Sequence, residues 1–260
     1  MRRKIAVRWT KLICLALAGS CGLGLAGANV GKDGGFQLLK LDGHHVKWGE
    51  DALGAGATVR YAFVSGPMRF DGARNCSELV PMTDLALRNG ISEATLHAEA
   101  AAAFRTWEEA ADITFIPVDD PGQADILIGA QGQPVGRAYA NVMYQPGSNN
   151  GVRAIDRALV CLNPEQSWKV GFDGDIEVYD LRYTLVHEIG HAIGLDHPGP
   201  SGQVMSFVYS ETYHDLQPGD FHGVRLLYGI GSKQMTAGGG QTPPPPESAP
   251  ENSGRLTSLP

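Results

Sequence analysis

Apolar residues recur at helical spacing in three segments of this 260-residue chain. The first segment follows Ser92, whose hydroxyl can cap a helix that runs to about Ala110. The second follows Asp180, which can cap a helix in the same way, and the third covers about residues 218–228. The second helix has one apolar face, which consists of Leu181, Leu185, Ile189 and Ala192.

Five other segments have the alternation or the β-branched composition of strands. They cover residues 58–64, 113–118, 125–128, 137–142 and 158–162. About five strands and three helices predict an α+β fold. Residues 29–230 are mixed in composition and long enough for one domain with its own core.

Both terminal segments differ from this central region. Residues 1–28 join a basic leader to an apolar stretch and end in Ala26-Gly27-Ala28, which predicts a cleaved signal peptide. We expect export to the periplasm or the medium, with no transmembrane segment in the mature chain. A second interpretation is a lipoprotein signal, with Cys21 as the lipidated residue. Residues 231–260 contain four consecutive prolines and little that is apolar, which predicts a disordered tail.

The net charge of the chain is −7. Removal of residues 1–28 takes away five basic and no acidic residues and leaves −12. A chain this acidic does not favour nucleic acid or an anionic membrane as a partner.

The predicted mature chain retains two cysteines, Cys76 and Cys161. Two thiols in an exported protein can form a disulfide. The alternative is that Cys161, which lies in the apolar run 158–162, is a buried free thiol. The sequence leaves both readings open.

The strongest chemical signal is the run HEIGHAIGLDH, which begins at His187. On a helix, His187 and His191 lie on one face and can hold one metal ion, while Glu188 can reach a water on that metal. Gly194 lets the chain leave the helix, so that His197 can supply a third ligand. Three neutral imidazoles and an open fourth position are the ligand set of a catalytic zinc site, whereas a structural site is closed by a fourth protein ligand.

This run resembles the signature HExxHxxGxxH of the metzincin zinc endopeptidases and, among them, the matrixins, which include the matrix metalloproteinases and bacterial relatives. Met205, eight residues beyond His197, corresponds to the Met-turn under the zinc of that family. The related serralysins use a tyrosine ligand where this chain has Phe207. Asp220 stands where the family is usually acidic. The resemblance implies a twisted, mostly parallel five-stranded sheet with an antiparallel edge strand, three helices, and an active-site cleft between an upper and a lower subdomain.

The sequence departs from vertebrate-type matrixins at the histidines that bind a second, structural zinc ion in those proteins. Arg137 stands at the first of these positions, and Leu159 or Val160 at the other. We therefore predict a single zinc ion, the catalytic one. The calcium loops of the family are not recognisable, so that Ca²⁺ has no clear motif here. Three acidic residues could still form a weak calcium site: Asp119, Asp120 and Asp125.

The resemblance and the metal chemistry together predict a zinc-dependent endopeptidase. A zinc ion lowers the pKa of bound water to about 7, and Glu188 would take the proton as general base. An extended substrate would pair with an edge strand and place the residue after the cut in a pocket walled by Phe207 and Tyr209. The edge-strand residues are Arg137, Ala138, Tyr139 and Ala140.

We expect a monomer whose partners are protein or peptide substrates, with no nucleic acid. An alternative from another class is a catalytically silent zinc-bearing module that binds extended peptides. Such modules usually lose the glutamate or a histidine, and this chain retains all four residues. A non-peptidase zinc hydrolase fits the metal chemistry but not the order of the surrounding segments.

Overall fold

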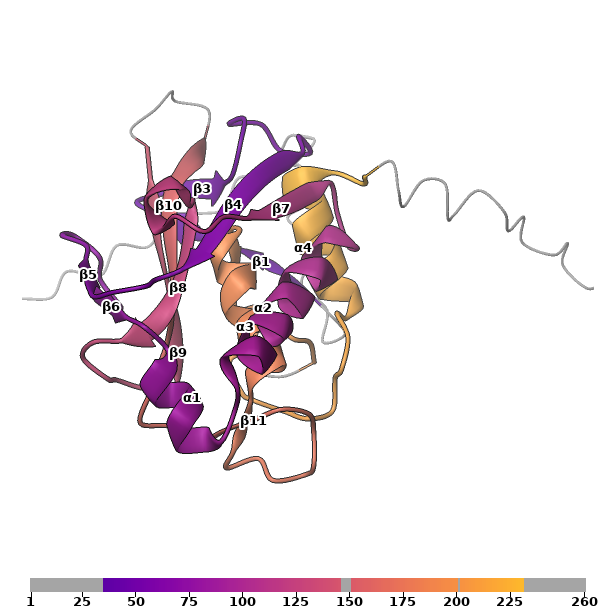
Figure 1. The fold of residues 1–260 in the computed structure, drawn as a ribbon. Coiled ribbons are helices and arrows are strands. Elements are labelled where there is room, and N and C mark those ends of the chain that lie inside the picture. Colours follow the sequence, from indigo (N-terminus) through magenta and orange to yellow (C-terminus); the bar gives the residue numbers. More distant parts are fainter. Residues whose placement is uncertain (1–34, 146–150, 201, 232–260) are drawn as a thin grey trace, which may run out of the picture.

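The computed structural model describes residues 35–145, 151–200 and 202–231. The predicted signal peptide 1–28, the alternative lipidation site Cys21 and nearly all of the predicted tail 231–260 lie outside the described residues. Within the described part, a mixed sheet forms one layer and helices cover one of its faces (Figure 1).

All five predicted strands are present. They are β4 (Ala57–Phe63), β7 (Ile113–Pro117), β8 (Ile126–Gln131), β9 (Ala138–Tyr144) and β10 (Val152–Leu162). Their spatial order is β7–β4–β8–β10–β9, in which the first four run parallel and β9 pairs antiparallel with β10. This confirms the mostly parallel sheet with an antiparallel edge strand.

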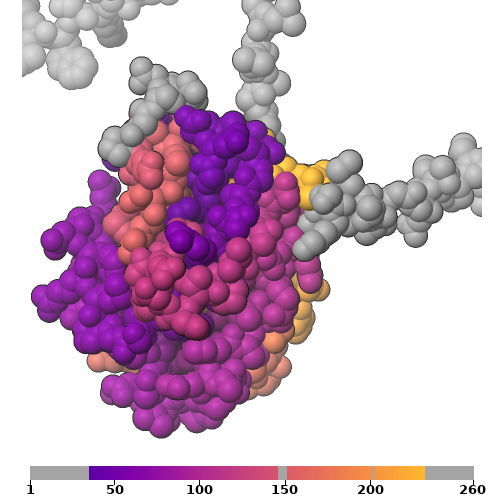
Figure 2. Space-filling view, turned by 45° about the horizontal axis from the view of Figure 1, so that its top comes forward, coloured from indigo at the N-terminus to yellow at the C-terminus, as the bar shows by residue number. Residues whose placement is uncertain are grey.

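Shorter strands enlarge the sheet to nine strands. β2 (Lys40–Leu41) and β3 (His44–Lys47) form a hairpin through Asp42 and Gly43, which both have positive φ, as a tight two-residue turn requires. β3 then pairs with the first residues of β10, so the indigo N-terminal segment lies beside the pink and salmon strand (Figure 2). β5 (Met68–Arg69) pairs antiparallel with β6 (Glu78–Val80), and β6 in turn pairs antiparallel with the last residues of β8.

The three predicted helices are present as α2 (Glu93–Glu108), α3 (Leu181–Ala192) and α4 (Pro218–Tyr228). The Ser92 side chain caps α2, as predicted, by accepting a hydrogen bond from the Thr95 N–H (3.0 Å).

The prediction of three helices was incomplete, because α1 (Thr83–Asn89) also forms. Its seven residues make about two turns, and only Leu85 and Ala86 are buried, so no extended apolar stripe marks it in the sequence. Met82 stands at its N-cap and offers no side-chain hydrogen bond. The signals that remain are weaker: Asp84 in the first turn, Arg88 in the last turn, and Gly90, which is left-handed, directly after the helix.

Alternate residues of the central strands face two cores. In β8, Ile126 and Ile128 join the main core with the helices, whereas Leu127 faces a second core beneath β5 and β6. The second core contains a disulfide between Cys76 and Cys161, whose Cα atoms lie 6.5 Å apart. Of the two alternatives for these cysteines, the structure has the bridge. It ties the loop between β5 and β6 to β10.

Short ladders lie at both ends of α3. β11 (Trp168–Lys169) pairs with β12 (Tyr179–Asp180), which leads into the helix. β13 (Leu195–Asp196) follows the helix and pairs with β1 (Gln37–Leu38). The connection between β7 and β8 contains the 3-10 helix η1 (Pro121–Gln123). In the part of the chain that the structure covers, no helix is long and apolar enough to cross a membrane.

Candidate metal centre and active-site cleft

Asp180 starts the helix that carries the metal-binding motif. Its carboxylate accepts hydrogen bonds from the backbone N–H groups of Tyr183 (2.7 Å) and Gly171 (2.6 Å), and so satisfies a donor of the first turn. Burial raises the pKa of Asp180, although these bonds oppose the shift. Further along, Trp107 of α2 donates its indole N–H to the Val186 carbonyl (2.9 Å), which fixes α3 against α2.

The chain turns sharply after α3, at Gly194. Its φ of +103° lies in a region that L side chains rarely adopt, and a Cβ there would collide with the carbonyl oxygen of Val46. Glycine is therefore needed both for the backbone conformation and for the close approach of β3. The turn leads through β13 and brings His197 back beside the helix.

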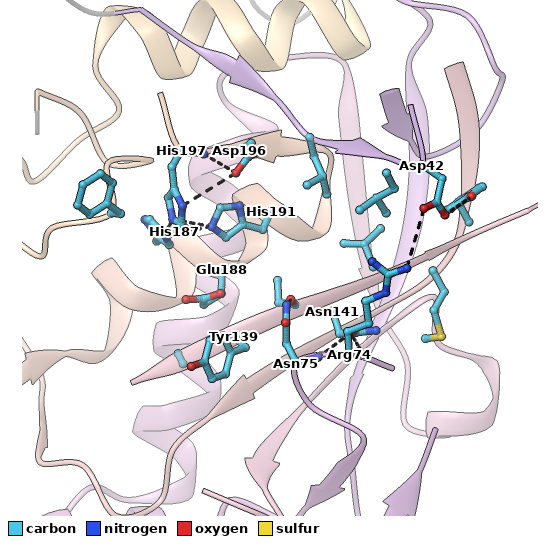
Figure 3. A pocket seen from close by; sticks show the side chains of 18 of the residues that line it. Asp42, Arg74, Asn75, Tyr139, Asn141, His187, Glu188, His191, Asp196 and His197 are labelled. Atoms are coloured by element: carbon cyan, nitrogen blue, oxygen red, sulfur yellow. Dashed lines mark hydrogen bonds and ion pairs between the residues drawn. The ribbon is translucent and has the colours of Figure 1, made fainter. Parts of the chain in front are cut away.

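The Nε2 atoms of His187, His191 and His197 converge on one point (Figure 3). They lie 3.2 Å apart between His187 and His191, and 3.0 Å apart in each of the other two pairs. Zinc–nitrogen bonds of about 2.0–2.1 Å in a tetrahedron separate the ligand atoms by roughly 3.3 Å, so this spacing fits a zinc ion. Among the described residues, these three histidines are the one group of three or more potential ligands close enough to hold a metal ion.

Backbone carbonyl groups orient two of the imidazoles. His187 Nδ1 lies 2.7 Å from the Val204 oxygen, and His191 Nδ1 lies 2.9 Å from the Leu195 oxygen. A proton on Nδ1 leaves the Nε2 lone pair free for a metal. Burial lowers the pKa of all three histidines, to about 4 for His191, so that they are in the neutral form that binds metal.

Glu188 lies beside the three imidazoles and lines the same cleft (Figure 3). It is 4% exposed, and this burial raises the pKa of its carboxyl to about 7. The positive charge of Arg137 and the backbone N–H of Ala140 oppose the shift. A carboxyl with this pKa can both accept and release a proton near neutral pH.

A turn at Val204 and Met205 supports the metal centre. The Asp220 carboxylate accepts hydrogen bonds from both backbone N–H groups (3.1 Å each), and the Val204 carbonyl in turn contacts His187. Met205 is buried against Gly190, where a Cβ would collide with its sulfur. Asp220 therefore orients His187 through this turn. The sequence indicated an acidic position here but not this contact.

The histidines and Glu188 line a cleft of about 1140 Å³ between the β9 edge and the segment after α3. Of the predicted substrate-binding residues, five line it: Arg137, Ala138, Tyr139, Ala140 and Phe207. Tyr209 does not. Its hydroxyl donates to Glu211 (2.9 Å) and accepts from the Asp180 N–H (2.9 Å), so it braces the start of α3. Arg74 and Arg153 also line the cleft, and no pattern in the sequence indicated either residue.

The side chains at the positions considered for a second zinc ion or a calcium ion contact other protein groups. The guanidinium carbon of Arg137 lies 5.0 Å from the ring centre of Tyr179. The Asp125 carboxylate pairs with Arg60 (3.0 Å), and Asp120 caps η1 through its side chain. Protein donors thus bind two of the carboxylates that a weak calcium site would need.

The mixed sheet, the helix with two histidines, the third histidine beyond a glycine turn and the methionine that packs against that helix define the metzincin class of zinc metallopeptidases. Comparison with known proteins gives the family. The family model described as Matrixin matches residues 84–229, more than half of the chain. The chain belongs to the matrixin family, whose members use a catalytic zinc ion.

Individual relatives are more distant. The chain is 28% identical over 151 residues to the interstitial collagenase of Sus scrofa, which covers 54% of this chain and 30% of that protein. It is 30% identical over 138 residues to matrix metalloproteinase-19 of Homo sapiens (52% of this chain, 26% of the relative). It is 34% identical over 104 residues to metallopeptidase AprA of Pseudomonas marginalis (39% and 20%). The chain thus spans less than a third of the length of these relatives.

Proposed function

We propose that this chain is a zinc-dependent endopeptidase in which His187, His191 and His197 hold the catalytic zinc ion and Glu188 is the general base. One observation carries the proposal. The three Nε2 atoms lie within 3.2 Å of one another beside a buried carboxyl, in the wall of an open cleft. A fold alone does not determine activity, whereas this set of groups has the ligands and the base that the reaction needs.

Glu188 would move the proton in the reaction. A zinc ion held by the three histidines would polarise a water molecule and lower its pKa to about 7. Glu188 accepts a proton from the attacking water and later returns it to the leaving nitrogen, so no proton is gained or lost over the cycle. The charge of Arg137 and the Ala140 N–H favour the ionised carboxylate, which is the form that must be present at the start.

An extended substrate would pair with the free edge of β9. Among the strands that the structure describes, β9 pairs with β10 alone. The backbone N–H and carbonyl of Ala140 point to the other side, because they contact Glu188 and the Asn75 side chain (3.1 Å). With the two-residue period of a strand, Ala138 and Val142 present their backbone groups to the same edge. Main-chain pairing of this kind supplies affinity, and side-chain pockets supply specificity.

The residue after the cut would meet Phe207, whose ring centre lies 6.1 Å from that of His197. The ring of Tyr183 on α3 packs edge to face against the ring of Tyr209, which follows Phe207 by two residues, with ring centres 5.1 Å apart. We therefore propose an apolar and shallow pocket, which would favour small or medium apolar side chains.

The domain organisation is part of the proposal. Residues 29–230 would form the catalytic domain, residues 1–28 would direct export, and residues 231–260 would form a disordered tail. The Cys76–Cys161 disulfide supports export, because disulfides persist in oxidising compartments. Cell fractionation, with the mass of the mature N-terminus, separates secretion, periplasmic retention and lipid anchoring at Cys21.

The decisive experiment is cleavage of a quenched fluorescent peptide library by the purified mature chain. It is run as isolated, after chelation, and after zinc is added back. Activity that is lost and then restored would support a zinc endopeptidase, and the cut sites would map the pocket. Stoichiometric zinc with no cleavage would favour the silent peptide-binding module instead.

A further inference from the structure

Three segments meet at the end of the cleft that lies away from the histidines (Figure 3). Asp42 comes from the β2–β3 turn, Tyr144 from the end of β9, and Arg74 from the loop between β5 and β6. The Tyr144 hydroxyl donates to Asp42 (2.8 Å). Tyr144 follows Ala140, which contacts Glu188, by four residues. At about 3.3 Å per residue, this end lies roughly 13 Å from the reaction centre.

The loop that presents Arg74 is held in place. The Asn141 side-chain oxygen of β9 accepts hydrogen bonds from the backbone N–H groups of Arg74 (2.8 Å) and Asn75 (3.2 Å). The Asn75 amide donates to the Ala140 carbonyl (3.1 Å), and the next residue, Cys76, is in the disulfide. The backbone of Arg74 is therefore fixed at the border of the cleft, while its side chain is exposed.

The charge of Arg74 has only a weak partner. Its guanidinium lies 3.9 Å from Asp42, and the side chains are 82% and 62% exposed. Exposed ion pairs of this length contribute little to stability, so a carboxylate from elsewhere can replace this contact at small cost. Asp42 keeps its hydrogen bond from Tyr144 in either case.

Arg153 of β10 adds donors that lack an acceptor. It lines the same cleft, and its Nε and Nη1 atoms are buried without a hydrogen-bond partner among the residues that the structure describes. His44 of β3 also lines this end and has an unpartnered buried Nδ1. Buried donors without acceptors are rare in folded proteins, and a charged acceptor would satisfy them best.

We propose that this end of the cleft binds an acidic side chain of the substrate, through Arg74 and Arg153, about four residues from the scissile bond. The proposal rests on the proposed endopeptidase function and adds a substrate class to it. A cationic recognition site in a chain with a net charge of −7 is a local feature that bulk charge does not explain. Antiparallel pairing with β9, the commoner geometry, would place the acidic residue on the N-terminal side of the cut.

The test starts from a peptide that the protein cleaves. Each position, from five residues before the cut to five after it, is replaced in turn by Glu, Gln or Lys. We expect kcat/KM to be about fivefold higher with Glu than with Gln at one position near the fourth, and lowest with Lys. The preference should weaken as salt is raised. A flat profile across all positions would overturn the proposal.

Substitutions then locate the preference. Arg74→Gln should reduce the preference for Glu to about twofold or less, and Arg74→Gln with Arg153→Gln should abolish it. Both effects should appear mainly in KM. Arg69→Gln is the matched control, because the Arg69 side chain is 77% exposed, pairs with Glu78 and does not line the cleft. It should leave the preference unchanged, and a loss in this variant equal to that in Arg74→Gln would contradict the assignment.

Different results would contradict the acidic subsite and the endopeptidase function. Cleavage without a charge preference would overturn the acidic subsite and leave the endopeptidase intact. If no peptide is cut, fluorescence anisotropy with labelled Glu and Gln peptides still measures whether the zinc-loaded chain prefers acid. Thermal unfolding of Arg153→Gln checks its fold, and Arg74→Gln, at an exposed side chain, tests the proposal without that risk.

Discussion

The two ends of the cleft differ in how their polar groups are satisfied. At the metal end, backbone carbonyls hold the ring nitrogens of His187 and His191, and Asp220 holds the turn beneath them. At the other end, Arg74 is exposed and Arg153 has buried donors without partners among the described residues. Fixed groups suit chemistry, which needs a set geometry before substrate arrives. Unfilled donors suit recognition, because the substrate brings the missing acceptor.

The largest expected effect is at the base of the metal end. Glu188→Gln keeps the size of the side chain but cannot accept the proton, so kcat should fall by about 10²–10⁴ with zinc content unchanged. Turnover and bound zinc are measured on the same sample. Glu109→Gln, an exposed position at the end of α2, is the control and should behave as the parent. Parental activity in Glu188→Gln would refute the assigned role.

Removal of the disulfide should affect the Arg74 end of the cleft and leave the metal end unchanged. Cys76→Ala with Cys161→Ala opens a bridge between residues 85 apart in sequence, which should lower the free energy of unfolding by about 3–4 kcal/mol. The bridge anchors the Arg74 loop and lies in the second core, so the preference for acidic peptides should fall. Denaturant unfolding, zinc affinity and the Glu-to-Gln ratio are measured together. Zinc affinity should stay unchanged. A loss of both zinc affinity and charge preference would show that the two ends are not independent.

Asp220 tests how far the metal end depends on support behind the ligands. Asp220→Asn replaces an acceptor of three backbone N–H groups, from Val204, Met205 and Gln217, by a side chain with one acceptor oxygen. We expect zinc affinity to fall by about 10- to 100-fold, because the turn that orients His187 loosens. Competition with a chromophoric chelator measures this. Asp215→Asn removes the same charge at an exposed position nearby and should not change the affinity.

The sequence could predict the metal end because its information is local. Two histidines four residues apart, a glycine and a third histidine all lie within one turn of helix and its exit. The strands of the sheet and the caps at Ser92 and Asp180 were predictable for the same reason. The other end of the cleft, with Arg74 and Arg153, could not be predicted in this way. Arg74 and Arg153 line the same cleft because of the register of β10 with its neighbours and because Asn141 and the disulfide hold the Arg74 loop.

Tyr209 shows a related limit. Tyr209 was placed beside the predicted pocket because it follows Phe207 by two residues. The direction of its side chain, however, depends on hydrogen bonds of its hydroxyl with Asp180 and Glu211. These partners belong to the start of α3 and to a neighbouring loop. No local pattern encodes that choice. The local signals for α1 are weak, because the helix lacks both a capping side chain at its start and an extended apolar stripe.

The smallest effect concerns the buried polar framework behind the metal end. Lys47 of β3 is fully buried and donates to the carbonyls of Trp48 (2.7 Å) and Glu50 (2.8 Å). Trp48 in turn donates its indole N–H to Ala192 (2.9 Å), at the end of α3. Burial lowers the pKa of Lys47 to about 8, against 10.5 when unfolded. Between these values the unfolded chain binds more protons, so this group makes stability rise with pH.

Between pH 8 and 9.5, the free energy of unfolding of the parent should therefore rise by about 1.5 kcal/mol relative to Lys47→Met, whose profile lacks this contribution. Only the slope is informative, because the substitution also leaves two carbonyls without their donor and lowers stability at every pH. Lys40→Met, at an exposed position on β2, should keep the parental slope. Equal slopes in the parent and Lys47→Met would mean that the Lys47 ammonium is exposed to water in solution. The buried polar contacts behind the metal end would then stop at α3 and would not include β3.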